Sequence, residues 1–183
     1  MSLSAPLDIQ FDWYPHRSVP VSDPYLANWL LDTGSLTERL QSMCRQFQVQ
    51  VLCHQQQPQQ TAGAGNPFIR DVLLLGDGQP WVFARSVIPE AINNGELLDL
   101  GSQPLGQRIF NDPRFVRGEF ELCSLSYERL LAAMPQPYAA QLVPLHETSI
   151  HKLFGRRSSF TFLHYSMSVA EIFLPQSPAY LRE

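Results

Sequence analysis

The sequence has few charged residues, and those it has are not clustered. Asp, Glu, Lys and Arg make up 16% of the 183 residues, and the formal net charge is −4. The thirteen basic residues are spread along the chain without a basic run, so the sequence lacks the electrostatic footprint of a protein that binds nucleic acid or an anionic membrane. We therefore expect a small-molecule partner and no nucleic-acid partner.

Cysteine is also scarce. Cys44, Cys53 and Cys123 are an odd number and include no C-x-x-C pair, which argues against a disulfide framework and against a zinc ribbon. The five histidines are scattered without the spacing of a metal triad, so no metal site is expected. No run of about 18 apolar residues occurs, and the N-terminus lacks the pattern of a secretory signal. We expect a cytoplasmic protein with no membrane span.

Three widespread catalytic and nucleotide-binding motifs are missing as well. The sequence has no G-x-S-x-G elbow, no G-x-x-x-x-G-K-[ST] loop and no G-x-G-x-x-G fingerprint. These absences argue against a serine hydrolase, a P-loop nucleotide enzyme and a dinucleotide enzyme.

What is present predicts one domain over residues 1–183, because 44% of the residues are hydrophobic and this length is usual for a single core. Asp23 followed by Pro24 is typical of a helix start, and Ser35 with Glu38 has the spacing of a capping box. We expect two short helices here, separated by a break at residues 32–34.

The rest of the chain reads mainly as strands. Residues 47–53 alternate as a half-buried strand, residues 54–67 read as a loop, and residues 67–89 as a hairpin turning at Gly76-Asp77-Gly78-Gln79. Further predicted elements are short helices within 89–100 and 103–110, a strand over 114–125, a helix over 126–134, a loop over 135–144, and strands over 158–165 and 168–175 that meet at a turn at 165–168. This order predicts an α+β fold, in which an antiparallel sheet carries helices on one face and encloses a pocket.

The hairpin places charges on apolar strands. Counting outward from Asp77-Gly78 puts Arg70 opposite Arg85, on the face lined by apolar side chains, where two like charges destabilise a sheet. Glu171 lies with similar parity among apolar residues of the last strand. Each of these three side chains therefore needs a partner or access to water.

Two interpretations of the arginines stay open at this point. In one, Arg70 or Arg85 forms a structural ion pair with Glu171 or Asp71, or the register slips and both arginines face solvent. In the other, both arginines await a ligand with two carboxylates, which the planar guanidinium fork suits. A second pair of arginines, Arg156-Arg157, could bind phosphate, but two adjacent arginines at the start of a strand are more commonly solvated.

Four blocks of sequence, in order along the chain, resemble the chorismate pyruvate-lyase family, whose members make 4-hydroxybenzoate for ubiquinone. They are "DPYLANWLLDTGSLTERL", "IRDVLLLGDGQPWVFARSVIP", "PLGQRIF", and "LFGRRSSFTF" with "AEIFLPQSPAY". The resemblance implies an antiparallel sheet of about six strands, helical flaps over an internal aromatic-acid pocket, and no cofactor. Differences from the family lie in the loops at 54–67 and 126–150.

The resemblance also implies roles for individual residues. Arg70 matches the arginine that binds the ring carboxylate, and Glu171 matches the glutamate that contacts the para hydroxyl. Leu36, where the family often has methionine, and Leu105 match flap and wall contacts. For the second carboxylate of chorismate, on its enolpyruvyl ether, we assign Arg85.

The sequence thus predicts a monomeric carbon–oxygen lyase with catalytic residues Arg70 and Glu171. The alternative is a non-catalytic sensor of aromatic acids, because effector domains of some bacterial repressors resemble this fold. Too few residues precede the first predicted helix for a winged helix, which weighs against the sensor. A family member that has lost activity is a third possibility.

Overall fold

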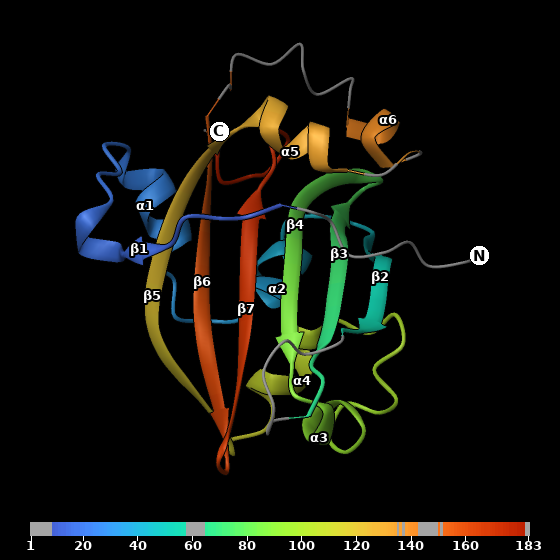
Figure 1. Ribbon diagram of the computed structural model, residues 1–183. Coiled ribbons are helices and arrows are strands. Elements are labelled where there is room, and N and C mark those ends of the chain that lie inside the picture. The colour runs from blue at the N-terminus through green and yellow to red at the C-terminus, as the bar shows by residue number, and fades with distance from the viewer. Residues whose placement is uncertain are drawn as a thin grey trace.

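The protein is described by a computed structural model, which covers residues 9–57, 65–134, 136, 138–142, 150 and 152–181. Its centre is one antiparallel sheet of seven strands in the order β1-β5-β6-β7-β4-β3-β2 (Figure 1). The strands are β1 (Tyr14–Pro15), β2 (Phe47–Gln56), β3 (Phe68–Gly76), β4 (Gln79–Ile88), β5 (Phe115–Ser126), β6 (Lys152–Phe162) and β7 (Tyr165–Phe173). The predicted α+β class with an antiparallel sheet is confirmed.

Helices pack against both faces of the sheet, whereas the sequence predicted them on one. The helical elements are η1 (His16–Ser18), α1 (Pro24–Leu30), α2 (Leu36–Gln41), α3 (Glu90–Asn93), α4 (Leu105–Phe110), α5 (Tyr127–Ala133) and α6 (Tyr138–Leu142). On one face, α1 and α2 share an apolar cluster with the middle of the sheet, and α3 and α4 share another with the lower end of the sheet in Figure 1. On the other face, α5, α6 and the segment before β1 cover a third cluster.

Both predicted N-caps of the first two helices are confirmed. The Asp23 carboxylate accepts a hydrogen bond from the Tyr25 amide at 2.9 Å, and Pro24 occupies the first helical position. The Ser35 hydroxyl accepts from the Glu38 amide at 3.3 Å. These caps satisfy amides that a helix start leaves without partners, which is why short polar residues at these positions predict the boundaries so well.

Several boundaries differ from the prediction. Strand β2 extends to Gln56, β1 adds a short edge strand, and α6 lies where a loop was predicted; residues 58–64 of the predicted loop lie outside the described residues. The turn between β6 and β7 is at residues 163–164 rather than 165–168, with Leu163 at φ 55°. No helix among the described residues is long and apolar enough to cross a membrane.

The hairpin turn is confirmed, but the pairing beyond it is not. Asp77 and Gly78 have φ values of 49° and 80°, as the two central positions of a type I′ turn require. Pro80 lies opposite Leu75 and Val82 opposite Leu74, so Trp81 is an extra residue in β4. From there to the end of β4 the register is shifted by one, and the predicted Arg70–Arg85 pairing is wrong.

Candidate active site

A pocket lies between the sheet and the helices α2 and α4. Every strand except β1 contributes to the sheet wall, and the helical wall includes Leu36 and Thr37 of α2 and Leu105 of α4. The lining atoms surround about 580 Å³ of empty space, a volume that includes the opening to solvent. The walls are mostly apolar, and four predicted site residues line them: Arg70, Glu171, Leu36 and Leu105.

Sheet register fixes where the two charged predicted residues stand. Arg70 of β3 is opposite Ser86 of β4, while Glu171 of β7 is opposite Ala84 of β4. Since Ser86 and Ala84 are two apart on one strand, all four side chains point to the same face. Arg70 and Glu171 therefore stand two strands apart, about 10 Å between backbones, and two residues apart along the strand direction.

Arg70 is a buried cation that forms no ion pair with a carboxylate among the described residues. Its relative exposure is 2%, its Nη2 donates to the Gln103 carbonyl at 3.3 Å, and its Nη1 is buried with no hydrogen-bond partner in the part of the chain that the structure describes. Burial lowers the pKa of Arg70 to about 10, so the side chain still carries its charge at neutral pH. A buried donor that makes no hydrogen bond is costly. Because Arg70 lines the pocket, its guanidinium can bind an anion there.

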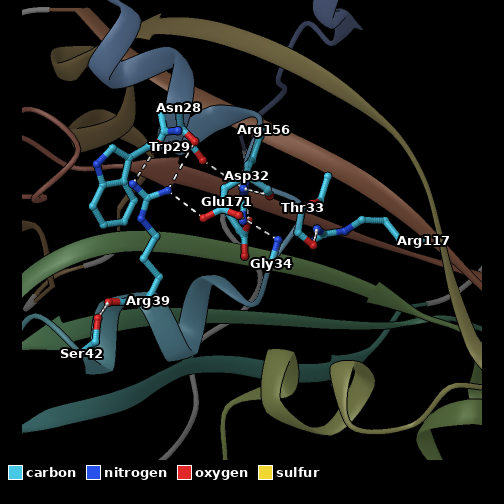
Figure 2. Close-up of polar contacts among 10 residues, drawn as sticks. All are labelled: Asn28, Trp29, Asp32, Thr33, Gly34, Arg39, Ser42, Arg117, Arg156 and Glu171. Atoms are coloured by element: carbon cyan, nitrogen blue, oxygen red, sulfur yellow. Dashed lines mark hydrogen bonds and ion pairs between the residues drawn. The ribbon is translucent and has the colours of Figure 1, made fainter.

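Glu171 is held by a buried arginine from the next strand. Arg156 lies directly opposite on β6, and its Nε donates to Glu171 Oε2 at 2.6 Å. The other side of the same guanidinium reaches the helical layer, where Nη1 donates to the carbonyls of Trp29 at 3.0 Å and Asp32 at 2.8 Å (Figure 2). Arg156 thus ties Glu171 to the connection between α1 and α2.

The sequence interpretation of Arg156 as solvated is wrong, since this side chain is 1% exposed. Its partner was hidden because the predicted turn at 165–168, three residues later than the observed one, would pair Glu171 with Phe162. The adjacent Arg157 points to the opposite face and pairs with Glu121 at 2.6 Å.

A second arginine of the pocket lining, Arg117 of β5, was not predicted. Its Nη1 donates to the Thr33 carbonyl at 3.0 Å, and its Nε is buried without a partner among the described residues. Its guanidinium lies 4.7 to 5.1 Å from the ring centroids of three phenylalanines, Phe110, Phe120 and Phe160. Burial is the main cause that lowers the pKa of Arg117 to about 10, against the opposing effect of the nearby Glu171 charge.

A β-bulge explains why alternation missed Arg117. Three steps along β5, from Arg117 to Phe120, correspond to two steps along β6, from Phe160 to Ser158. The extra residue lets Arg117 and Phe120 face the same side although their numbers differ in parity. Gly118 permits this, since a Cβ there would collide with the Ser159 hydroxyl.

The two helices that close the pocket touch each other. Leu36 and Leu105 are buried at the first positions of α2 and α4. A Cβ on Gly106 of α4 would come within 2.8 Å of the Thr37 hydroxyl of α2, so glycine allows the close approach. The apolar contacts predicted at Leu36 and Leu105 are therefore placed where both helices meet over the sheet.

Arg85 lies on the other face of the sheet and does not line the pocket. Its Nε and Nη2 donate to the two carboxylate oxygens of Asp71 at 2.8 and 2.9 Å, and its Nη1 donates to the Ile9 carbonyl at 3.3 Å. The structural ion pair with Asp71 is confirmed, and the expected place of Arg85 beside Arg70 is wrong because Trp81 shifts the register.

Within the described ranges, no group of three or more His, Cys, Asp or Glu side chains is arranged to hold a metal ion.

Known proteins similar to this chain agree with one another. The family model described as chorismate lyase matches residues 9–183. A protein of Pseudoalteromonas atlantica named probable chorismate pyruvate-lyase is 41% identical over 180 residues, covering 92% of this chain and 88% of that protein. One of the same name from Shewanella loihica is 35% identical over 182 residues, covering 96% and 93%.

A solved structure shares the fold at low sequence identity. It is the gene product SA0254 from Staphylococcus aureus, with a TM-score of 0.50 and 10% identity, and the match covers 78% of this chain and 88% of that one. At this identity the likeness concerns the fold alone.

Proposed function

The chain belongs to the chorismate lyase family, and from that premise we propose that it is a chorismate pyruvate-lyase acting in ubiquinone biosynthesis. It is a carbon–oxygen lyase that converts chorismate to 4-hydroxybenzoate and pyruvate. The family match and the relatives support the reaction, and the residues of the pocket support the way in which the substrate is held.

The observation that carries the assignment of the site is the unpartnered Nη1 of Arg70 inside an apolar pocket. A guanidinium in such a place matches the ring carboxylate of an aromatic acid. Glu171 stands two strands away on the same face, so a ring bound to Arg70 would extend across β4 toward it. We assign the ring carboxylate to Arg70 and the C4 hydroxyl to Glu171.

The reaction requires little from the protein beyond position. The C3–O ether bond of chorismate breaks, one hydrogen leaves C4, and the ring becomes aromatic, which lowers the barrier. The departing enolpyruvyl group gains that hydrogen on its methylene carbon and leaves as pyruvate. Either the hydrogen passes directly or Glu171 carries it.

Positioning is the role that the geometry of Glu171 supports first. Its Oε2 is engaged by Arg156, which leaves Oε1 to accept from the C4 hydroxyl. Leu36 and Leu105 would press the ring against the sheet, because α2 and α4 meet over the pocket. An arrangement that fixes the ring at both ends holds the C3–O and C4–H bonds in one orientation throughout the reaction.

The experiment is incubation of the purified protein with chorismate, followed by measurement of 4-hydroxybenzoate by absorbance and of pyruvate by a coupled dehydrogenase. We expect both products in equal amounts. The matched controls are Arg70→Ala in the pocket and Arg114→Gln, an exposed arginine outside it. Tight binding of 4-hydroxybenzoate without turnover of chorismate would favour the non-catalytic sensor instead.

A further inference from the structure

The pocket carries more positive charge than its own carboxylate can balance. Among the described residues that line it, Glu171 is the single carboxylate, and Arg156 already pairs with it. Arg70 and Arg117 line the same pocket, and neither forms an ion pair with a described carboxylate. Nearby Asp32 is paired with Arg39 at 2.7 Å. Two guanidinium charges therefore remain, and a ligand with two carboxylates would compensate both.

The three charged groups also lie in a useful order across the sheet. Arg70 is on β3, Glu171 on β7 and Arg117 on β5, so that two strand spacings, or about 10 Å, separate each group from the next. Chorismate presents its polar groups in the same order. The ring carboxylate is at C1, the hydroxyl is across the ring at C4, and the enolpyruvyl carboxylate extends from C3 beyond the hydroxyl.

We propose that Arg117 binds the enolpyruvyl carboxylate of chorismate, an inference that rests on the proposed function and replaces the role expected for Arg85. The Nε of Arg117 is a buried donor without a partner among the described residues, and Arg117 lines the pocket. The rings of Phe110, Phe120 and Phe160 hold the guanidinium in place. Arg156 also has an unpartnered Nη2, but it is a poorer candidate because its Nε and Nη1 are engaged and it does not line the pocket.

This contact distinguishes substrate from product. Chorismate would form two carboxylate–guanidinium contacts, one at Arg70 and one at Arg117, whereas 4-hydroxybenzoate keeps only the first. When the ether bond breaks, the second carboxylate leaves with pyruvate. Because Nη1 of Arg117 donates to the Thr33 carbonyl, the substrate contact would also extend to the connection between α1 and α2, and the aromatic product would lack it.

The test compares two ligands in three variants: Arg117→Gln, Arg117→Lys and the control Arg114→Gln. For Arg117→Gln we expect the KM for chorismate to rise at least tenfold, equivalent to about 1.4 kcal/mol, while the Kd for 4-hydroxybenzoate, measured by calorimetry, stays within a factor of two. Arg117→Lys keeps the charge without the fork, so its KM should lie between those of Arg117→Gln and the wild type. Arg114 pairs with Asp112 and Glu96 at the surface, and its variant should change neither constant.

Three outcomes would overturn the inference. An unchanged KM for chorismate in Arg117→Gln removes Arg117 from substrate binding. An equal loss of affinity for chorismate and for 4-hydroxybenzoate means that Arg117 shapes the pocket rather than binding the second carboxylate. Wild-type protein that binds 4-hydroxybenzoate but leaves chorismate unchanged overturns the proposed function, and the inference with it.

Discussion

Arg156 and Glu171 face each other across β6 and β7 as an ion pair of 2.6 Å, with side-chain exposures of 1% and 15%. The pair lies between the pocket and the α1–α2 connection, and it has two kinds of partner. Glu171 lines the pocket, while Arg156 donates to carbonyls of the helical layer. The Arg156 guanidinium therefore holds Glu171 in the proposed site and also binds the helical layer that covers the pocket.

Breaking this pair should destabilise the fold strongly. Arg156→Leu leaves Glu171 without its partner in a mostly buried position, so we expect the free energy of unfolding to fall by about 3–5 kcal/mol. Urea denaturation measures the change. Removing both charges in Arg156→Leu/Glu171→Leu should restore part of the loss, because no unpaired charge then remains. Arg157→Leu, which breaks a half-exposed pair on the other face, is the control and should cost about 1 kcal/mol or less.

Arg70 should control affinity for any aromatic carboxylate. Hydrogen bonds to charged groups contribute about 1.5 to 3 kcal/mol, so Arg70→Ala should raise the Kd for 4-hydroxybenzoate at least tenfold. The affinity for benzoate, which lacks the hydroxyl, should fall by the same factor in Arg70→Ala. In Glu171→Gln, by contrast, only the ligand with the hydroxyl should be affected. Unchanged binding of 4-hydroxybenzoate by Arg70→Ala would remove Arg70 from the site.

The same arginine should lower the stability of the ligand-free protein. Burial lowers its pKa from the ordinary arginine value to about 10, so the folded state binds the proton less tightly than the unfolded state does. This cost is complete below pH 10 and shrinks as the pH rises above 10. At neutral pH, Arg70→Met should therefore raise the free energy of unfolding by up to about 3 kcal/mol.

Bound 4-hydroxybenzoate should make the wild type more stable to unfolding than Arg70→Met. With excess 4-hydroxybenzoate the wild type gains stability by mass action, and Arg70→Met gains little because it binds weakly. Thermal melts with and without ligand provide the comparison. A ligand-free Arg70→Met variant that melts well below the wild type would show that the arginine stabilises the empty pocket.

Two glycines of one hairpin should respond differently to alanine. Gly78 has φ 80° and open space around its missing Cβ, so Gly78→Ala should cost about 1–2 kcal/mol through backbone strain alone, with ligand affinity unchanged. A Cβ on Gly76 would collide with the Trp81 ring. Gly76→Ala should therefore displace Trp81, disturb the bulge of β4 and weaken 4-hydroxybenzoate binding. Equal effects of the two substitutions on affinity would contradict this distinction.

Local chemistry in the sequence predicted the ends of elements better than the facing of side chains. The caps at Asp23 and Ser35 and the turn at Asp77-Gly78 depend on nearby backbone groups, and all three are confirmed. The predicted meeting of Arg70 with Glu171 relied on the family resemblance, and both line one pocket. The variants Arg70→Ala and Glu171→Gln test the roles assigned to these two residues.

The errors come from places where the strands depart from regular alternation. Trp81 adds a residue to β4, so Arg85 lies on the face opposite to the predicted one. The bulge after Arg117 adds a residue to β5, so Arg117 lies on the face of the pocket. The hydrophobic pattern of the hairpin could not reveal the register shift, because β3 and β4 are apolar on both faces and an apolar cluster covers each face. A turn placed three residues late likewise concealed the pairing of Arg156 with Glu171.

The extra residue at Trp81 decides which face of the sheet each later side chain of β4 takes. If β4 kept its length but paired with β3 without the bulge, the facing of every side chain from Val82 to Ile88 would reverse. Arg85 would then enter the apolar pocket near Arg70, its partner Asp71 would be stranded on the far side, and Ser86 would turn away. At this point of the molecule, the bulge in the strand pairing rather than residue identity decides which charges a bound acid meets.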